Sequence, residues 1–386
     1  MADTTIMRRN NLQLVLDAIA DNDCITASEL VKETGLSVAT ISRVITQLRA
    51  KGLVMQTRKT DTEVGRKPEV CRICGTYGSS LYLNLKSGCL QGFLLDFSGE
   101  VIGRAEYPVG PDLTVDGFLQ MALQLREFLT CGNAGRLLAV CLSVPGQLDQ
   151  RTGTVCRIPN FPGFERAALQ SRMEEAMGVP CLIRNTARLT AWGCHQSHRQ
   201  ENDSLIYVDI TADGGIGAGL VINGRLYEDH AGLVGEMGDM IVSIRAYGKQ
   251  EIQTRGALEL EAGLNTVLHK CADLLEQSRL PSLSRLEELS CSDSRIAAVL
   301  ENATRAWAAA IVNLVAVLSP DEVVLGGDLS EENRQIHAMI RRHLSELYYR
   351  DIRFRMAEPD SQYHVRGAAQ VSRTRLFGDA LDEISG

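Results

Sequence analysis

The first fifty residues carry the pattern of three short helices, which limits the fold more than any other feature. Apolar side chains in residues 12–20 recur at the spacing of one helix face, so an amphipathic helix is predicted there. Thr26 and Glu29 have the spacing of a capping box that opens a second helix, and Gly35 suits its end. Ser37 is a favourable N-cap for a third helix, whose buried face would be Val38, Ile41, Val44, Ile45 and Leu48. Two helices joined by a short turn with glycine are typical of a helix-turn-helix.

The third predicted helix has an outer face suited to a DNA groove. Its N-cap and outward positions hold small or hydrogen-bonding side chains and one arginine, namely Ser37, Ala39, Thr40, Ser42, Arg43 and Gln47. Short polar groups can approach base edges in the major groove, and an arginine can contact guanine or phosphate. We therefore predict that Arg43, with its polar neighbours, reads the major groove. An ordinary solvated helix face is the alternative.

Two short strands, predicted over residues 53–58 and 69–74, would form a wing beside this helix. In the turn between them, Arg66 and Lys67 suit the negative potential of a narrow minor groove. The net charge of the chain is -8, yet residues 37–72 hold eight basic and three acidic side chains. A basic segment on an acidic body is the charge pattern of a small DNA-contacting domain. A hairpin that touches nothing is the alternative.

From residue 79 onward the pattern changes to alternating strands and helices, which indicates layered α/β domains with a cleft at the strand ends. Strands are predicted over 81–85, 90–97, 137–144, 205–210, 219–222 and 322–325. Residues 303–318 are apolar nearly all round, which predicts a buried helix. The predicted division is a winged helix-turn-helix over 1–78, a first α/β lobe over 79–195, and a second lobe over 196–386 that carries the oligomerisation surface and a C-terminal helix packing back.

Several short motifs in a fixed order resemble the ROK family of repressors, open reading frames and sugar kinases. The matching segments are 34–42, 65–68, 143–146, 158–164, 214–219, 235–238 and 325–329. The resemblance runs from about Arg9 to the end of the chain. It implies a winged helix-turn-helix followed by a two-lobed body of the actin/hexokinase type. It also implies a transcriptional regulator, specifically a repressor.

The chain departs from the kinases of that family at the positions that carry the chemistry. Those kinases have an acidic residue in their phosphate loop, whereas the equivalent segment here, residues 83–88 (Leu-Asn-Leu-Lys-Ser-Gly), has none. Those kinases also have an Asn-Asp pair whose aspartate is the catalytic base, whereas this chain has Asn185 and Thr186. A threonine hydroxyl is far too weak a base at neutral pH. Asp239 replaces the family's zinc-binding histidine, and residues 247–258 contain no cysteine. We therefore expect no catalytic residue, no metal, no cofactor and no enzyme activity.

Part of a sugar-binding site is nevertheless retained. The resemblance implies that Asn160, Glu236 and Glu259 hydrogen-bond sugar hydroxyls, and that Asn185 and Asp239 lie beside them. Carboxylate and amide groups are suited to bind vicinal hydroxyls. The expected effector is a sugar or sugar derivative. Another small molecule, or no small effector, is the alternative.

Neither a signal peptide nor an apolar run of 18 residues is present, so we expect a cytoplasmic protein without membrane association. The function that follows is sequence-specific regulation of transcription, with double-stranded DNA and a small effector as partners. Two DNA-binding heads on a pseudo-palindrome would need a homodimer or homotetramer. The alternatives are an active sugar kinase and a regulator that responds to a protein or a non-sugar ligand.

Overall fold

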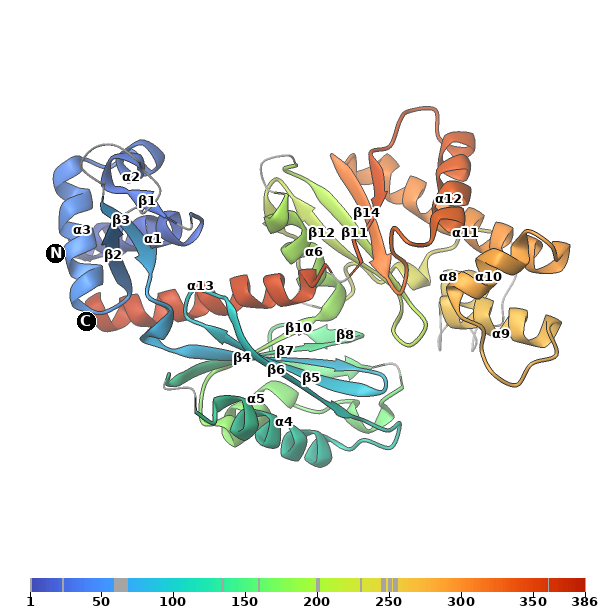
Figure 1. Cartoon of the computed structure of the whole chain (residues 1–386), viewed down its shortest axis with the longest axis horizontal. Helices are drawn as coiled ribbons and strands as arrows, with labels where there is room; N and C mark the ends of the chain where they lie inside the picture. The colour runs from blue at the N-terminus through green and yellow to red at the C-terminus, as the bar shows by residue number, and fades with distance from the viewer. Residues whose placement is uncertain are drawn as a thin grey trace.

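The computed structural model describes residues 2–22, 24–58, 69–132, 135–158, 160–198, 202–229, 231–243, 248, 252, 256–359 and 361–385. The chain forms a small N-terminal head and two α/β lobes, and a long C-terminal helix runs between the lobes and the head (Figure 1). The predicted fold class, a winged helix-turn-helix followed by a two-lobed body, is confirmed.

The head contains three helices and a three-stranded sheet. Its elements are α1 (Ala2–Ala20), β1 (Ile25–Thr26), α2 (Ala27–Thr34), α3 (Val38–Ala50), β2 (Val54–Arg58) and β3 (Glu69–Ile73), with strand order β1-β3-β2. The predicted capping box between Thr26 and Glu29 is present, and Gly35 ends α2 with a φ of 69°, a conformation that glycine adopts without strain. The predicted apolar face of α1 is buried, at Leu12, Val15, Leu16 and Ile19.

Two details of the head differ from the predictions. Helix α1 begins at Ala2, ten residues before the predicted start, because its polar first half has no apolar face for periodicity to detect. Val38 was expected in the core but is 71% exposed, whereas Ile41, Val44, Ile45 and Leu48 are buried. Val38 is the first residue of α3, one turn before the segment that packs on the other helices, so its side chain lies beyond the core.

The first lobe is a mixed five-stranded sheet with helices on both faces. Its strands are β4 (Ser79–Lys86), β5 (Cys89–Asp96), β6 (Val101–Pro108), β7 (Leu137–Val144) and β10 (Cys181–Asn185), in the order β10-β7-β4-β5-β6. Helices α4 (Val115–Thr130) and α5 (Leu169–Met177) bury their apolar sides in a cluster on one face. A small ribbon of β8 (Gln147–Asp149) and β9 (Thr154–Arg157) follows β7.

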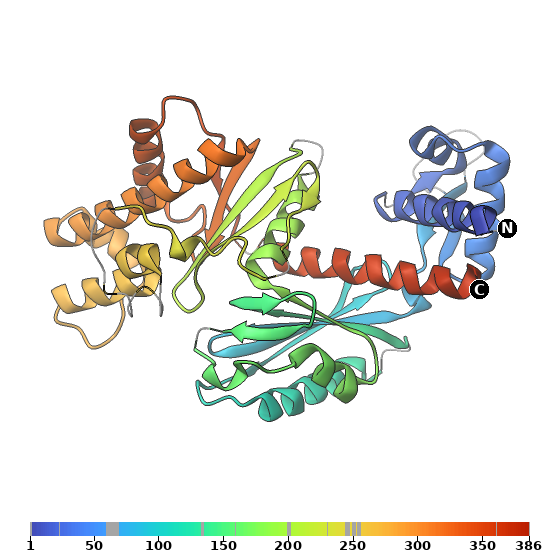
Figure 2. The ribbon, with the colours of Figure 1, turned by 180° about the vertical axis from the view of Figure 1, so that it is seen from behind.

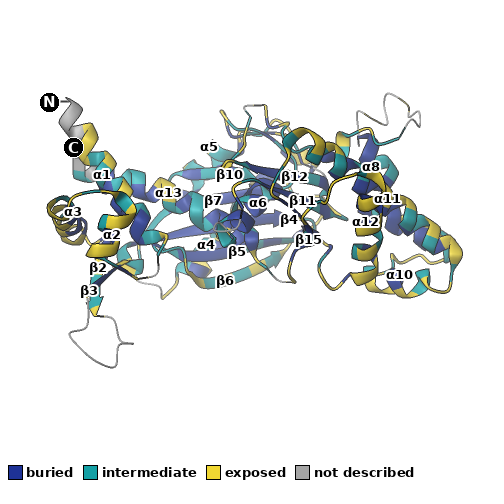
Figure 3. Ribbon diagram, turned by 90° about the horizontal axis from the view of Figure 1, so that it is seen from above, coloured by how far each residue is buried: buried dark blue, intermediate teal, exposed yellow. Residues whose placement is uncertain are grey.

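The second lobe repeats the arrangement around a second five-stranded sheet. Its strands are β11 (Leu205–Thr211), β12 (Gly215–Ile222), β13 (Arg225–Leu226), β14 (Glu322–Gly327) and β15 (Phe354–Met356), in the order β13-β12-β11-β14-β15. Its helices are α6 (Thr186–Ser197), α8 (Ala257–Ala262), α9 (Leu264–Leu274), α10 (Leu283–Ser290), α11 (Ser294–Leu318) and α12 (Arg334–Leu347). Figure 3 shows both sheets as buried layers.

Two sequence predictions for this lobe need correction. The strand expected over 219–222 begins at Gly215, and its glycines hid the pattern because they carry no side chain. A Cβ atom on Gly219 would overlap Ala191, so the glycine allows α6 to lie close on β12. The helix expected over 303–318 was predicted to be buried all round, but Val317 is 82% exposed because it faces away from the core, on which Leu314, Val315 and Leu318 of the same helix pack.

Helix α13 (Tyr363–Ser385) joins the three parts of the molecule (Figure 2). Its first half lies across α6 and buries Val365 and Ala368 against the first lobe's sheet. Its second half packs on α1, where Phe377 and Leu381 share the hydrophobic core of the head. The helix thus packs mainly on the first lobe and the head, while Tyr363 at its start lies in a hydrophobic cluster with Tyr207 and Val324 of the second lobe.

Helices α6 and α13 cross at a pair of glycines. A Cβ atom on Gly367 would overlap the carbonyl oxygen of Leu189 in α6, and one on Gly193 would overlap the carbonyl oxygen of Tyr363 in α13. The two backbones therefore approach as closely as only glycine permits.

Replacing Gly367 tests this crossing. Gly367→Ala should lower the free energy of unfolding by about 1–3 kcal/mol, because the added methyl group forces the helices apart. Gly378→Ala, in the same helix but with no atom within 4 Å of the new Cβ, should be neutral or stabilising by up to about 1 kcal/mol. Urea denaturation of both variants measures the difference, and equal stabilities would contradict a tight crossing.

Candidate functional site

The first candidate site is the outer face of α3, which Figure 3 shows as largely exposed. Ala39, Ser42 and Arg43 are exposed, and Thr40 and Gln47 are partly exposed. Within the part of the chain that the structure describes, Arg43 makes no ion pair with the protein. The face predicted to approach a DNA groove is therefore open, while the opposite face forms the core of the head.

Ser37 has a local role at the start of this helix. Its hydroxyl oxygen accepts a hydrogen bond from the backbone N–H of Thr40 at 3.2 Å, which makes it the predicted N-cap. The two side-chain hydroxyls also lie 2.9 Å apart. Ser37 thus fixes the start of α3, and a direct DNA contact from it stays a prediction.

The predicted wing is an antiparallel pair of strands. In β2 and β3, Val54 lies opposite Ile73 and Arg58 opposite Glu69. The tip of the wing, with Arg66 and Lys67, lies outside the described residues. Their proposed contact with the minor groove stays a prediction.

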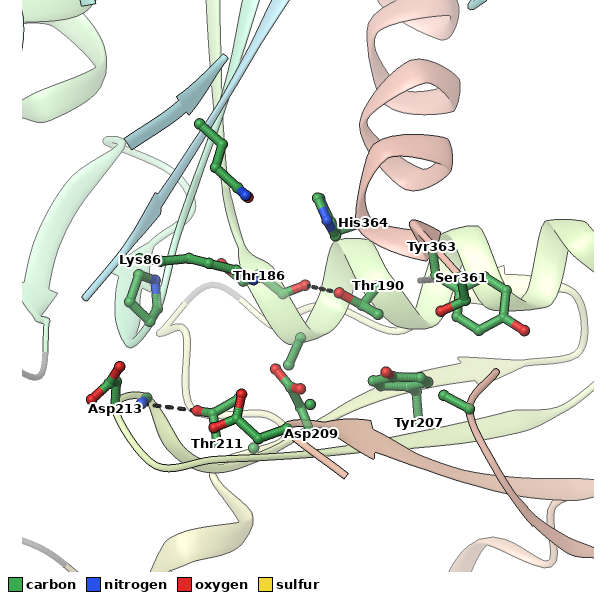
Figure 4. Close-up of a pocket in the computed structure, with 18 of the residues that line it drawn as sticks. Lys86, Thr186, Thr190, Tyr207, Asp209, Thr211, Asp213, Ser361, Tyr363 and His364 are labelled. Carbon is green, nitrogen blue, oxygen red and sulfur yellow. Dashed lines mark hydrogen bonds between the residues drawn. The ribbon is translucent and has the colours of Figure 1, made fainter. Parts of the chain in front are cut away.

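The second candidate site is a cavity of about 740 Å³ between the two lobes. Ends of β4, β11 and β14 and the starts of α6 and α13 line it. Figure 4 shows Asp209 and Asp213 on the sheet side, Thr186 on α6, and Tyr363 and His364 where α13 begins. The cavity lies at the ends of strands, as expected for a layered α/β fold.

A glycine-rich loop between β11 and β12 forms part of the cavity wall. Three of its backbone N–H groups donate to side chains of the protein itself. The N–H of Ala212 donates to Asp328 Oδ2 at 2.8 Å, that of Gly214 to Thr211 Oγ1 at 2.8 Å, and that of Ile216 to Glu259 Oε2 at 2.9 Å. These bonds hold the loop in one conformation.

Asn185 and Thr186 lie where the strand β10 passes into α6. Asn185 caps the helix, because its Oδ1 accepts from the backbone N–H of Arg188 at 3.2 Å while its Nδ2 donates to the carbonyl of Gly146 at 2.8 Å. Thr186 Oγ1 is inaccessible to solvent and has no hydrogen-bond partner among the described residues. Both residues line the cavity, and neither offers a carboxylate as a general base.

The structure brings only some of the predicted sugar-binding residues to the cavity wall. Asn185 and Glu236 line it, and burial raises the pKa of Glu236. Asn160 lies at the rim, where its Nδ2 donates to Ser87 Oγ at 3.0 Å and to the carbonyl of Asp213 at 2.7 Å.

Glu259 and Asp239 lie behind this wall. Glu259 accepts the loop hydrogen bond from Ile216, and Asp239 belongs to a short 3-10 helix, Met237–Asp239. Contact of Asn160, Asp239 and Glu259 with a ligand stays a prediction.

Two further findings concern metals and membranes. Among the described residues, no group of three or more histidine, cysteine or acidic side chains could hold a metal ion. No helix in the same part of the chain is both long and apolar enough to cross a membrane.

Comparison with known proteins identifies the family. The sequence profile of the ROK family matches residues 89–375, well over half of the chain. The chain belongs to the ROK family. The profile of the MarR family matches residues 14–67, which cover most of the head.

The ROK chain is similar to named repressors along nearly all of its length. It is 26% identical to the xylose repressor of Bacillus subtilis over 355 residues, an alignment that covers 90% of each protein. It is 21% identical to the dual regulator NagC of Escherichia coli, over 100% of this chain and 97% of that one. A crystal structure of a ROK family regulator, a homologue of the E. coli MLC protein, superposes with a TM-score of 0.79 at 21% identity and covers 98% of this chain and 99% of its own.

One polar network of this ROK protein was missed by sequence reasoning. His364 Nδ1 lies 3.1 Å from the hydroxyl of Tyr82, which lies 2.8 Å from Ser143 Oγ, and Ser143 donates to Asn84 Oδ1 at 2.8 Å. The network joins the start of α13 to β4 and β7 of the first lobe. No local signal could reveal it, because His364 and Tyr82 are 282 residues apart in sequence.

The buried His364 should make the free energy of unfolding of this protein depend on pH. Burial, and then the charge of Lys86, lowers the pKa of His364 to about 3. The pKa of histidine in the unfolded chain is near 6.5, so between about pH 6.5 and pH 3 the unfolded chain binds a proton at this residue and the folded protein does not. The free energy of unfolding therefore decreases as the pH falls through this range. When the pH is lowered from 7 to 5, the free energy of unfolding of His364→Gln should therefore decrease by about 1–2 kcal/mol less than that of the wild type.

Urea denaturation of both proteins at each pH gives this comparison. Asp209, whose pKa is raised to about 6 by burial and by Asp328, acts in the opposite direction but equally in both proteins. Identical pH slopes for the two proteins would contradict a neutral, buried His364.

Proposed function

We propose that this ROK chain is a DNA-binding transcriptional repressor whose affinity for DNA depends on a sugar or sugar derivative in the cleft between the lobes. The observation that carries the proposal is the path of α13. At its start, Tyr363 and His364 line the cavity, and near its end Phe377 packs in the core of the head. One continuous helix therefore contacts both the ligand cavity and the DNA-binding domain.

Polar contacts strengthen the connection between α13 and the head. Arg373 donates to the carbonyl oxygen of Ala20 at 2.9 Å and to Asp21 Oδ1 at 2.8 Å, both at the end of α1. Arg9 in α1 pairs with Asp382 at 2.7 Å. A shift of α13 would therefore be transmitted to α1 and, through the shared core, to α3.

The effector acts in this proposal by differential affinity. A ligand can shift the equilibrium between two arrangements of the head only by as much as it prefers one of them. Binding between the lobes would favour one position of the start of α13, and the glycine crossing with α6 would limit how far that helix can move independently. The similarity of this chain to the xylose repressor of Bacillus subtilis supports repression as the direction of regulation.

The DNA contacts proposed for the head follow from the exposed face of α3. Arg43, with Thr40, Ser42 and Gln47, would lie in the major groove, and Arg66 and Lys67 would contact the minor groove or its phosphates. A homodimer or homotetramer would present two heads to a pseudo-palindromic site.

Arg43 provides the test of DNA reading. A DNA fragment selected by the purified protein from a random pool should bind Arg43→Ala about 10- to 100-fold more weakly, because one base contact contributes about 1–3 kcal/mol. Arg305→Ala, an exposed arginine of α11 in the second lobe, removes the same charge and should bind as the wild type does. Gel-shift titration at fixed salt gives both affinities. If Arg43→Ala bound as tightly as this control, Arg43 would not read DNA.

We further propose that the cleft binds without catalysing phosphoryl transfer. The residues that open α6 offer an amide and a hydroxyl, so the position where the kinases of the family would carry their base has no group able to accept the proton of a sugar hydroxyl. Coupled ADP release with ATP, Mg²⁺ and a panel of hexoses, pentoses and amino sugars should remain at the level of a blank. Turnover with any of these sugars would favour the kinase alternative.

A further inference from the structure

The glycine-rich loop in the cavity wall already uses several backbone N–H groups for hydrogen bonds within the protein. Such loops bind phosphate through backbone N–H groups that point at the anion. Here the N–H groups of Ala212 and Ile216 already donate to the carboxylates of Asp328 and Glu259, and that of Gly214 donates to a threonine hydroxyl. Three backbone N–H groups, two in the loop and one at the start of β12, are thus already engaged by side chains of the protein and are not available to phosphate oxygens.

The charge of the cavity wall also disfavours a phosphate group. Among the described residues that line it are one lysine and one arginine, Lys86 and Arg104, and six carboxylates, Glu106, Asp209, Asp213, Glu236, Asp328 and Glu358. Burial, and then the negative charge of Asp328, raises the pKa of both Asp209 and Asp213. Above pH 7 a phosphate group would therefore enter a negative field.

The same wall is suited to hydroxyl groups. Carboxylates accept hydrogen bonds from hydroxyls, and an uncharged sugar presents several such donors without adding negative charge.

We infer that the cleft takes a sugar that carries no phosphate group and discriminates against sugar phosphates and nucleotides. The inference rests on the proposed function and names the ligand class of that site. Two independent features carry it: the loop N–H groups are occupied by side chains, and the wall has an excess of carboxylates.

Matched pairs of sugars test the discrimination. Isothermal calorimetry at pH 7.5 would compare D-glucose with glucose 6-phosphate, and N-acetylglucosamine with its 6-phosphate, with D-xylose as a further uncharged sugar. At least one uncharged sugar should bind, and its phosphate should bind at least about tenfold more weakly.

Variants of the wall locate the effect. Two variants remove negative charge from the cavity: the single variant Asp213→Asn and the double variant with Asp209→Asn as well. Both should reduce the difference in affinity between a sugar and its phosphate by several-fold. Asp351→Asn, an exposed aspartate outside the cavity wall, changes the net charge as much as Asp213→Asn does and should leave the difference unaltered. Thermal unfolding of each variant without ligand verifies that it is folded.

Several results would overturn the inference. They are tighter binding of either sugar phosphate than of its parent sugar, absence of binding by all three uncharged sugars, and an equal difference in the wall variants and the Asp351 control. Failure here is distinguishable from failure of the proposed function, because DNA binding by the wild type and by Arg43→Ala is measured separately. A protein that binds selected DNA and responds to a sugar phosphate would retain the function and lose only this ligand class.

Discussion

The close crossing of α6 and α13 is the contact on which the rest of the structure depends. Gly193 and Gly367 let the two helices meet backbone to backbone, so α13 is fixed across the first lobe while α6 is fixed against the sheet of the second. The same α6 begins with Asn185 and Thr186 at the cavity. The ligand cavity, the two lobes and the path to the head thus converge on one helix pair.

In the proposed function, the two-lobed fold serves to bind a ligand and respond to it. Two lobes that enclose a cavity can change their relative position when a ligand binds, and a regulator needs that change without turnover. The cavity has no carboxylate at the start of α6, where Asn185 caps the helix, and Asp328 and Glu259 hold the glycine-rich loop in place.

Local features of this chain could be predicted from sequence because their causes are local. The capping box at Thr26, the end of α2 at Gly35 and the N-cap at Ser37 each depend on neighbours within a few residues. Features that depend on distant contacts could not be predicted in this way. The position of His364 beside Tyr82, and the use of Glu259 to hold the loop, arise only when the lobes assemble.

Errors in the prediction have the same origin. Val38 fits the helical period but lies one turn beyond the packed segment of α3, and Val317 lies on the side of α11 that faces away from the core. Periodicity indicates which residues share a helix face, whereas the extent of the neighbouring element decides how much of that face is covered. The polar start of α1 has a period too weak to detect, and its contact with α13 through Arg9 is a tertiary one.

The most direct test of the account is the change in DNA affinity that a bound sugar causes when the contact between α13 and the head is weakened. Arg373→Ala removes the bonds to Ala20 and Asp21, whereas Arg375→Ala removes only a pair with Asp379 within α13 itself. With a sugar that binds the cleft, the ratio of DNA affinities without and with sugar should fall toward one in Arg373→Ala and stay at the wild-type value in Arg375→Ala. An unaltered ratio in Arg373→Ala, with sugar binding retained, would contradict transmission through α13.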